Sequence, residues 1–237
     1  MRMSQTRLRV LIIVPAFNEE GSIVSAIEDI KENASFADYI VIDDGSTDQT
    51  ADICKSRNYR HVSLPVNLGL AGAFQTGMKY ALEKGYDYAV QFDADGQHSA
   101  KYIQSMVENA ESNSSDIVIG SRFLTKKKPK TLRMLGSILI TRMILYTTGA
   151  RISDPTSGMR LFNKKTIRLC AKEPDFSPEP DTIAHLGRSG AKITQVPVEM
   201  RERVAGESYL SFSRSVTYML RVCISILFVQ WFRGKAR

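Results

Sequence analysis

Two carboxylates one residue apart, Asp93 and Asp95, stand directly after a short β-rich run at 88–92. Because residues i and i+2 of a strand point to the same side, both carboxylates can face one point just beyond the strand's end. Oxygen ligands suit a hard divalent cation, and Mg²⁺ is usually held by one or two carboxylates while substrate phosphates complete its shell. With the nearby Gln97, the pair predicts a Mg²⁺ or Mn²⁺ site for a bound diphosphate, although Asp, Gly and Gln also suit an ordinary turn.

The elements that must position these carboxylates are runs of apolar, β-branched residues alternating with segments of helical spacing. We expect buried strands at 8–14 and 39–42, a short strand at 61–64, and further strands at 88–92 and 116–120. Strands that alternate with helices indicate βαβ units and a mainly parallel sheet, which binds ligands at the carboxyl ends of its strands. The sequence therefore predicts an α/β fold.

Polar residues collect at the ends of the expected strands. They are Asn18 and Glu19 after the first, Asp43 and Asp44 after the second, Asp93 and Asp95 after the fourth, and Ser121 and Arg122 after the fifth. Because the carboxyl ends of parallel strands meet at one edge of a sheet, we expect these residues to share a site. No GxxxxGKS/T or GxGxxG loop follows a strand. A bound diphosphate must therefore be neutralised by a metal and by basic side chains.

After Arg122 the alternation weakens, with helices expected near 134–147 and 164–171 and a last strand at 192–198. We interpret residues 1–208 as one domain, because 237 residues with 43% hydrophobic content suit a single substantial core. We expect a donor-binding half at about 1–123 and an acceptor half at 124–208, and we expect 209–237 to form a basic amphipathic helix and tail. Three widely spaced cysteines without CxxC favour a reducing compartment and argue against zinc or a disulfide framework.

The C-terminal segment 209–232 has helical periodicity. Arg214, Thr217, Arg221 and Ser225 recur on one side, and Val216, Met219, Leu220, Cys223, Ile226 and Leu227 on the other. Its uninterrupted apolar part is shorter than the ~20 residues that a membrane span needs. Together with the net charge of +7, this predicts a helix lying at an anionic membrane surface. The alternative is a terminal helix packed on the protein's own core.

Taken in order, the motifs resemble those of the inverting family 2 glycosyltransferases, most closely the branch of dolichyl- and polyprenyl-phosphate sugar synthases. The resemblance covers about residues 8–210 and rests on IIVPAFNEEGSI, VIDDGSTDQT, the Asn-Leu-Gly at 67, FDADGQH, GSRF and DPTSGMRLF. It implies the GT-A (Rossmann-like) fold, a mixed, mainly parallel sheet flanked by helices. It also implies metal-dependent transfer of a sugar from a UDP-, GDP- or dTDP-linked donor to polyprenyl phosphate.

The same resemblance assigns roles to single residues. Those expected to contact the nucleotide sugar are Pro15, Ala16, Asn18, Glu19, Asp43, Asp44, Asp93 and Ala94, and those expected to hold the metal are Asp93, Asp95 and Gln97. Those expected to bind the acceptor and its phosphate are Arg122, Ser157, Arg160, Arg203 and Ser208. The chain departs from this branch at Tyr209, where the late Arg-x-x-Gly-x-Ser-Lys segment typically has its lysine.

The nature of the acceptor decides whether a general base is needed. A lipid phosphate is already anionic, whereas a hydroxyl of a lipid-linked saccharide in cell-surface polysaccharide synthesis must lose its proton to a carboxylate. The candidates are Asp181 and Glu179, which resemble the acidic pair at the acceptor end in relatives, and Asp154. Each of the three also suits a helix cap or a turn.

Two other classes remain as alternatives. A nucleotidyltransferase would carry a glycine-rich, lysine-containing loop after the first strand, where this chain has PAFNEEG. A non-enzymatic module for nucleic acid would leave the acidic strand ends unexplained, because carboxylates repel phosphate. We therefore expect no nucleic-acid partner. For a transferase with a lipid acceptor and a basic amphipathic helix, we expect a peripheral position on the cytoplasmic face of the cell membrane. Whether a membrane-protein partner completes the site is left open.

Overall fold

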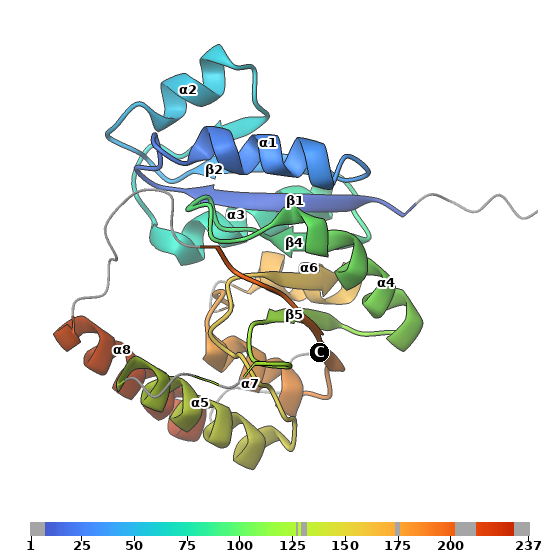
Figure 1. Ribbon diagram of the computed structural model, residues 1–237, viewed down its shortest axis with the longest axis vertical. Helices are drawn as coiled ribbons and strands as arrows, with labels where there is room; N and C mark the ends of the chain where they lie inside the picture. The colour runs from blue at the N-terminus through green and yellow to red at the C-terminus, as the bar shows by residue number, and fades with distance from the viewer. Residues whose placement is uncertain (1–7, 127, 129–131, 174–175, 202–211, 230–237) are drawn as a thin grey trace, which may run out of the picture.

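The computed structural model describes residues 8–126, 128, 132–173, 176–201 and 212–229 (Figure 1). Within these ranges seven strands form one sheet in the order β3-β2-β1-β4-β6-β5-β7. They are β1 (Val10–Ala16), β2 (Asp38–Asp43), β3 (His61–Ser63), β4 (Tyr88–Gln91), β5 (Ile117–Ser121), β6 (Arg160–Asn163) and β7 (Ile193–Pro197). Strand β6 runs antiparallel to both of its neighbours, and the other pairs are parallel. The predicted mixed, mainly parallel sheet is confirmed.

Helices cover both faces of the sheet. They are α1 (Ile23–Asn33), α2 (Thr50–Ser56), α3 (Gly69–Glu83), the 3₁₀ turn η1 (Ala100–Tyr102), α4 (Ile103–Asn113), α5 (Leu132–Thr148), α6 (Lys164–Lys172), α7 (Pro180–Arg188), α8 (Phe212–Ile224) and the π-helical turn η2 (Ser225–Val229). Alternate residues of β1 enter opposite cores, because side chains of a strand alternate between its faces. Ile12 belongs to the core that contains residues of α1, α2 and α4, and Ile13 belongs to the core that contains residues of α3, α5, α6, α7 and α8.

Strand β1 extends further than predicted, to Ala16, although Pro15 cannot donate a backbone hydrogen bond. Pairing with β4 involves only residues Val10 to Ile13, whereas pairing with β2 continues to Ala16. Pro15 therefore lies where β4 has already ended, and one edge of the strand no longer needs its N–H.

Strand β6 is an element to which the sequence assigns no structure. It has four residues, too few for an apolar period to appear. Its antiparallel register places Arg160 beside Gln91, the last residue of β4. The preceding loop, residues 154–159, therefore continues past the carboxyl end of β4, which is where Asp93 lies.

Helix α8 packs against α5 and α7 (Figure 1). The Tyr218 hydroxyl donates to the Glu179 carboxylate, and Ser225 Oγ donates to Asp181 Oδ2 at 2.6 Å. The predicted division of its faces is wrong for two residues, because Ser225 faces α7 and Leu220 is exposed. Helical periodicity alone groups Ser225 with the arginines, but the hydrogen bond to Asp181 turns its hydroxyl toward α7.

Large apolar side chains are exposed on this helix pair, among polar ones such as Arg142 and Arg221. The exposed apolar side chains are Leu139, Leu145 and Tyr146 of α5, Leu220 and Ile224 of α8, and Phe228 of η2. Among the described residues, no helix has both the length and the apolar character needed to cross a membrane.

Candidate functional site

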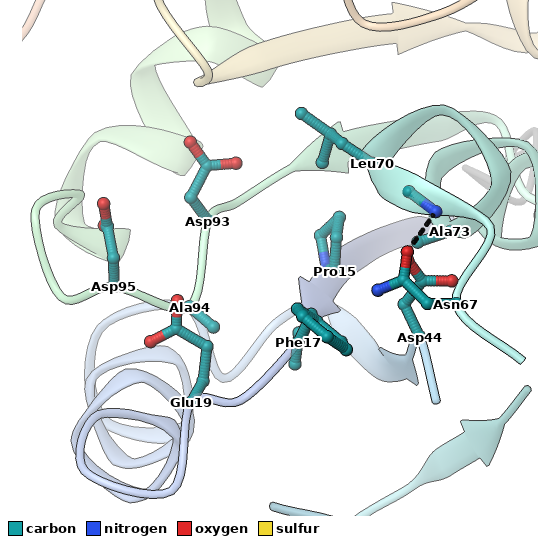
Figure 2. A pocket seen from close by; sticks show the side chains of 12 residues that line it. Pro15, Phe17, Glu19, Asp44, Asn67, Leu70, Ala73, Asp93, Ala94 and Asp95 are labelled. Carbon is teal, nitrogen blue, oxygen red and sulfur yellow. Dashed lines mark hydrogen bonds between the residues drawn. The ribbon is translucent and has the colours of Figure 1, made fainter. Parts of the chain in front are cut away.

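A cavity of about 370 Å³ opens at the carboxyl ends of β1, β2 and β4 (Figure 2). We call it the strand-end cavity. The residues predicted to contact the nucleotide sugar that line it are Pro15, Ala16, Glu19, Asp44, Asp93 and Ala94. Lining residues that the sequence analysis did not assign are Phe17, Asn67, Gly69, Leu70 and Ala73. Asp93 and Asp95 lie on one side of the cavity, with Asp44 and Asn67 on the other.

Asn18 and Asp43 do not line this cavity; Asn18 joins the loops after β1 and β2, and Asp43 holds the turn of its own loop. Asn18 has a φ of 55°, a left-handed conformation that asparagine tolerates. Its Oδ1 accepts from Thr47 N at 2.8 Å, and its own N–H donates to Ser46 Oγ at 3.0 Å. Asp43 Oδ1 accepts from Ser46 N at 3.1 Å. The loops after β1 and β2 are therefore held together by their own side chains.

The loop after β2 also reaches the segment before α3. Asp44 is almost fully buried, and its Oδ1 accepts from Leu68 N at 2.8 Å. Gly45 has a φ of +69°, and a Cβ there would lie 2.8 Å from the carbonyl carbon of Val66. Only glycine permits this approach. It brings the Asn-Leu-Gly motif at Asn67 to the cavity. This motif, and PAFNEEG for Phe17, are the sequence signals for lining residues that were not assigned.

The acidic pair is held by its own strand end and loop. Gln91 Nε2 donates to Asp93 Oδ1 at 3.1 Å, and Asp93 N donates to His98 Nδ1 at 3.1 Å. Asp95, 7% exposed, accepts from Gln97 N at 3.0 Å through Oδ1. His98, to which the sequence analysis assigns no role, is buried and fixes the backbone that carries Asp93. Its only sequence signal is its place in FDADGQH.

A second cavity, of about 270 Å³, begins on the other side of the same carboxylates. We call it the helix-side cavity. Its lining is Asp93, Asp95, Gln97, His98, Arg122, Met134, Ser137, Ile140, Thr156, Gly158, Met200, Tyr218 and Met219. Helices α5 and α8 and the loop 154–159 supply most of this wall. Because Asp93 and Asp95 border both cavities, a group bound to them can be reached from either one.

The donor atoms at this junction fit a hard cation. Asp93, Asp95 and Gln97 offer oxygen, and the Asp93 side chain is 34% exposed. No cluster of three or more acidic, histidine or cysteine side chains able to hold a metal occurs within the described ranges. Two carboxylates suit Mg²⁺, whose shell is usually completed by substrate phosphates. That Asp93, Asp95 and Gln97 hold the metal stays a prediction.

Arg122 lines the helix-side cavity and binds Asp154 with both arms of its guanidinium. Nε donates to Oδ2 at 2.6 Å, Nη2 donates to Oδ1 at 2.8 Å, and the Arg122 backbone N–H donates to Oδ2 at 3.1 Å. The Asp154 side chain is 0% exposed. Both oxygens of this candidate base are therefore engaged by one arginine.

Replacing Arg122 with Gln is expected to lower the free energy of unfolding by about 3 kcal/mol, because a fully buried carboxylate loses its cation. Urea denaturation measures the change. Adding Asp154→Asn to Arg122→Gln should recover much of the lost free energy of unfolding. The control Arg57→Gln, at an exposed arginine of the loop after α2, should change the free energy of unfolding little. A loss for Arg122→Gln no larger than that of Arg57→Gln would contradict the pairing.

Arg160 and Ser157 line neither cavity. Arg160 is 2% exposed and donates to backbone carbonyls of Ser157 at 2.9 Å, Pro155 at 2.9 Å and Glu179 at 3.4 Å. Burial lowers the pKa of the Arg160 guanidinium. Ser157 is fully buried, and its Oγ accepts from Met159 N at 3.3 Å. Both residues brace the loop 154–159, and a contact of either with acceptor phosphate stays a prediction.

Glu179 binds α8 and Asp181 binds η2, as described above, and neither lines the two cavities. Burial and the neighbouring Glu179 raise the pKa of Tyr218, which keeps its hydroxyl protonated as the donor. A role for either carboxylate as general base stays a prediction. Arg203 and Ser208 lie outside the described residues.

Comparison with known sequences identifies the family. The family described as "Glycosyl transferase family 2" matches residues 11–169. An undecaprenyl-phosphate mannosyltransferase of Micrococcus luteus is 31% identical over 219 residues, which cover 86% of this chain and 88% of that protein. A UDP-N-acetylglucosamine–dolichyl-phosphate N-acetylglucosaminyltransferase of Methanococcus voltae is 29% identical, covering 69% of this chain and 73% of the relative.

Solved structures share the fold. Glucosyl-3-phosphoglycerate synthase from Mycobacterium tuberculosis, in complex with Mn²⁺, UDP and phosphoglyceric acid, superposes with a TM-score of 0.69 at 20% identity, covering 94% of this chain and 78% of that one. A mannosyltransferase from Pyrobaculum calidifontis with GDP-mannose and Mn²⁺ gives a TM-score of 0.67 at 19% identity, covering 98% and 67%. The fold is GT-A. The chain belongs to glycosyl transferase family 2 and is a hexosyltransferase.

Proposed function

We propose that this enzyme is a metal-dependent inverting glycosyltransferase that moves a sugar from a nucleotide-sugar donor to polyprenyl phosphate. The observation that carries the proposal is the position of Asp93 and Asp95 between the strand-end cavity and the helix-side cavity. One cavity suits the nucleotide, the other suits the acceptor, and the carboxylates stand at the point where the two substrates must meet. Relatives named for undecaprenyl and dolichyl phosphate support the choice of acceptor.

The strand-end cavity has the chemistry of a nucleotide site. Phe17, Leu70 and Ala73 offer apolar walls for a base, and Asp44 offers a carboxylate that can accept from a base or ribose donor. Mg²⁺ or Mn²⁺ at Asp93, Asp95 and Gln97 would stabilise the negative charge of the leaving nucleoside diphosphate. Neighbours of the same fold bound to Mn²⁺ with UDP or GDP-mannose support this reading.

The helix-side cavity combines a cation with apolar walls, as an isoprenoid phosphate requires. Arg122 and Ser137 can donate to phosphate oxygens, while Met134, Ile140 and Met219 supply apolar surface. A phosphate oxygen of the acceptor attacks the anomeric carbon, forming a new C–O bond as the bond to the donor diphosphate breaks, and the configuration inverts. Positioning the two substrates in line is the main contribution of the protein.

An anionic acceptor also agrees with the state of the candidate bases. Asp154 is bound by Arg122, Glu179 binds α8, and Asp181 binds η2. An acceptor phosphate has no proton that must be removed, so none of these carboxylates has to act as a base. This favours lipid phosphate over a saccharide hydroxyl.

We further propose that the enzyme lies peripherally on the cytoplasmic face of the cell membrane through α5 and α8. Their outer sides carry six exposed apolar residues, among them Tyr146, which is 86% exposed. Such an apolar face on a basic protein suits the interface of an anionic bilayer. It also lies on the helices that wall the helix-side cavity, so the lipid acceptor and its site are at the same surface.

The test is a release assay with purified protein, Mg²⁺ or Mn²⁺, and a panel of UDP-, GDP- and dTDP-sugars. Polyprenyl phosphate and a lipid-linked saccharide are supplied separately as acceptors. Release of nucleoside diphosphate together with a glycosylated lipid phosphate is the expected result. Release only with the lipid-linked saccharide would overturn the acceptor assignment and require a base among Asp154, Glu179 and Asp181.

A further inference from the structure

A third cavity, of about 530 Å³, lies along α5 and shares no lining residue with the other two. We call it the basic cleft. Four of its lining residues are cations, Lys126, Lys128, Arg142 and Arg151, and its apolar wall includes Ile138 and Leu145. The proposed transfer reaction uses none of the four cations.

Most of this positive charge has no acidic partner. Lys126 pairs with Glu199 at 2.7 Å, and both side chains are 66% exposed. In the part of the chain that the structure describes, Lys128, Arg142 and Arg151 form no ion pair with a carboxylate. The basic cleft is thus a concave surface with an excess of positive charge beside apolar side chains.

Lys128 is the least solvated of these cations. Its Nζ donates to Ser137 Oγ at 3.0 Å and to Thr141 Oγ1 at 3.1 Å, and it lies 5.5 Å from the centre of the Phe123 ring. Burial lowers the pKa of the Lys128 ammonium. A partly buried ammonium satisfied only by hydroxyls and a ring is stabilised further when an anion binds beside it.

We propose that the basic cleft binds the phosphate headgroup of an anionic membrane phospholipid. Arg142 and Arg151 are exposed at the cleft, where their guanidinium groups can meet phosphate oxygens in pairs. Ile138 and Leu145 offer apolar contact to the first part of the acyl chains. Leu145 also belongs to the exposed apolar face of α5, so a lipid seated here continues into the bilayer that this face contacts. A free phosphate ion would leave that apolar wall unused.

This inference rests on the proposed membrane position and adds a specific anchor to it. Lys128 contacts Ser137, which lines the helix-side cavity, so the anchored headgroup lies next to the proposed acceptor site. Binding of the headgroup would hold that cavity against the bilayer surface from which polyprenyl phosphate arrives. The expected kinetic effect is confined to acceptors presented in membranes.

The test compares two double variants that lose the same charge at opposite ends of the molecule. Arg142→Gln with Arg151→Gln removes the two exposed cations of the cleft. Lys55→Gln with Arg57→Gln removes two exposed cations at the end of α2, which lies far from α5 (Figure 1). Flotation with vesicles of phosphatidylglycerol and phosphatidylcholine measures membrane affinity. We expect the cleft variant to bind about tenfold or more weakly, since each such cation contributes ~1 kcal/mol near an anionic surface, and the α2 variant to bind like the wild type.

Equal losses of vesicle affinity in the two double variants would overturn the proposal, because net charge alone would then set binding. No loss of vesicle affinity in the cleft variant would also overturn it, because other contacts would then set binding. Displacement of the wild type from vesicles by inorganic phosphate, but not by chloride of equal ionic strength, would assign the cleft to free phosphate instead. The KM for polyprenyl phosphate in anionic vesicles should rise in the cleft variant, while that for a short, water-soluble acceptor stays unchanged.

Nucleotide binding by the same proteins separates this inference from the proposed function. If the cleft variant loses vesicle binding as expected but the wild type binds no nucleotide sugar, the proposed transfer is wrong and the proposed lipid site is retained. Wild-type protein that transfers sugar to polyprenyl phosphate, with vesicle binding indifferent to Arg142 and Arg151, would remove the lipid site alone.

Discussion

Replacing Asp95 with Asn is expected to lower turnover by on the order of a thousandfold, because losing an anionic ligand of the cation removes several kcal/mol of stabilisation from the departing diphosphate. Asn has nearly the same shape, and its carbonyl can still accept from Gln97 N, as Oδ1 of Asp95 does at 3.0 Å. The melting temperature should therefore change little. Initial rates over a range of Mn²⁺ concentrations, with thermal unfolding of the same samples, measure both quantities.

A matched control is Asp52→Asn, which neutralises an exposed carboxylate in the first turn of α2. It should retain the rate and the metal dependence of the wild type. Turnover of Asp95→Asn within about tenfold of wild type, a loss too small for a direct metal ligand, would refute the assignment of Asp95 to the metal.

Replacing Gly158 with Ala is expected to lower metal-dependent turnover by about a hundredfold, because small displacements of reacting groups cost rates of that order. A Cβ at this position would lie 2.1 Å from Asp93 Oδ2 and 3.1 Å from His98 Cε1. Gly158 is not among the residues of positive φ, so its backbone accepts alanine and the carboxylate of Asp93 must move instead. Gly158 is thus a positioning residue. Weaker Mn²⁺ binding, measured by calorimetry in the presence of nucleoside diphosphate, is the accompanying expectation.

A thermodynamic cycle separates this role from a general packing effect. Asp93→Ala removes the oxygen that the new Cβ would meet, so Gly158→Ala should cost less stability in that background than in the wild type. Gly187→Ala in α7 is the control, because a Cβ there lies at ordinary contact distances of 3.4 Å or more. Equal costs of Gly158→Ala in both backgrounds would contradict an action through Asp93.

Most of the sheet is predictable from the sequence because strands such as β1, β4 and β5 are buried on both faces. Runs such as Leu11 to Val14 appear as unbroken apolar segments, and their ends mark where ligands bind. Strand β6 escapes this reasoning, since its four residues include Arg160 and Asn163. Its pairing with β4 and β5 is decided by strands distant in sequence, and with it the approach of Gly158 to Asp93.

The acidic residues at the strand ends are also predictable, but which of them line the cavity and which of them hold the loops is not. Asn18 and Asp43 resemble ligands by type and position, yet in the structure they hold the turn at Ser46 and Thr47. The apolar lining residues Phe17 and Leu70 cannot be told from core residues until the cavity is seen. Likewise, helical periodicity predicts α8 but not its inner face, which depends on the carboxylates of α7.

The central claim is that Asp93 and Asp95 hold a cation that binds the donor diphosphate at the junction of two cavities. Calorimetric titration of UDP and GDP into wild-type protein and the Asp95→Asn variant, each with and without Mn²⁺, tests it most directly. We predict that Mn²⁺ strengthens binding of one of the two nucleotides to the wild type by about tenfold or more, and that this gain is lost in the variant. Nucleotide affinities that are indifferent to Mn²⁺ in both proteins would contradict the claim.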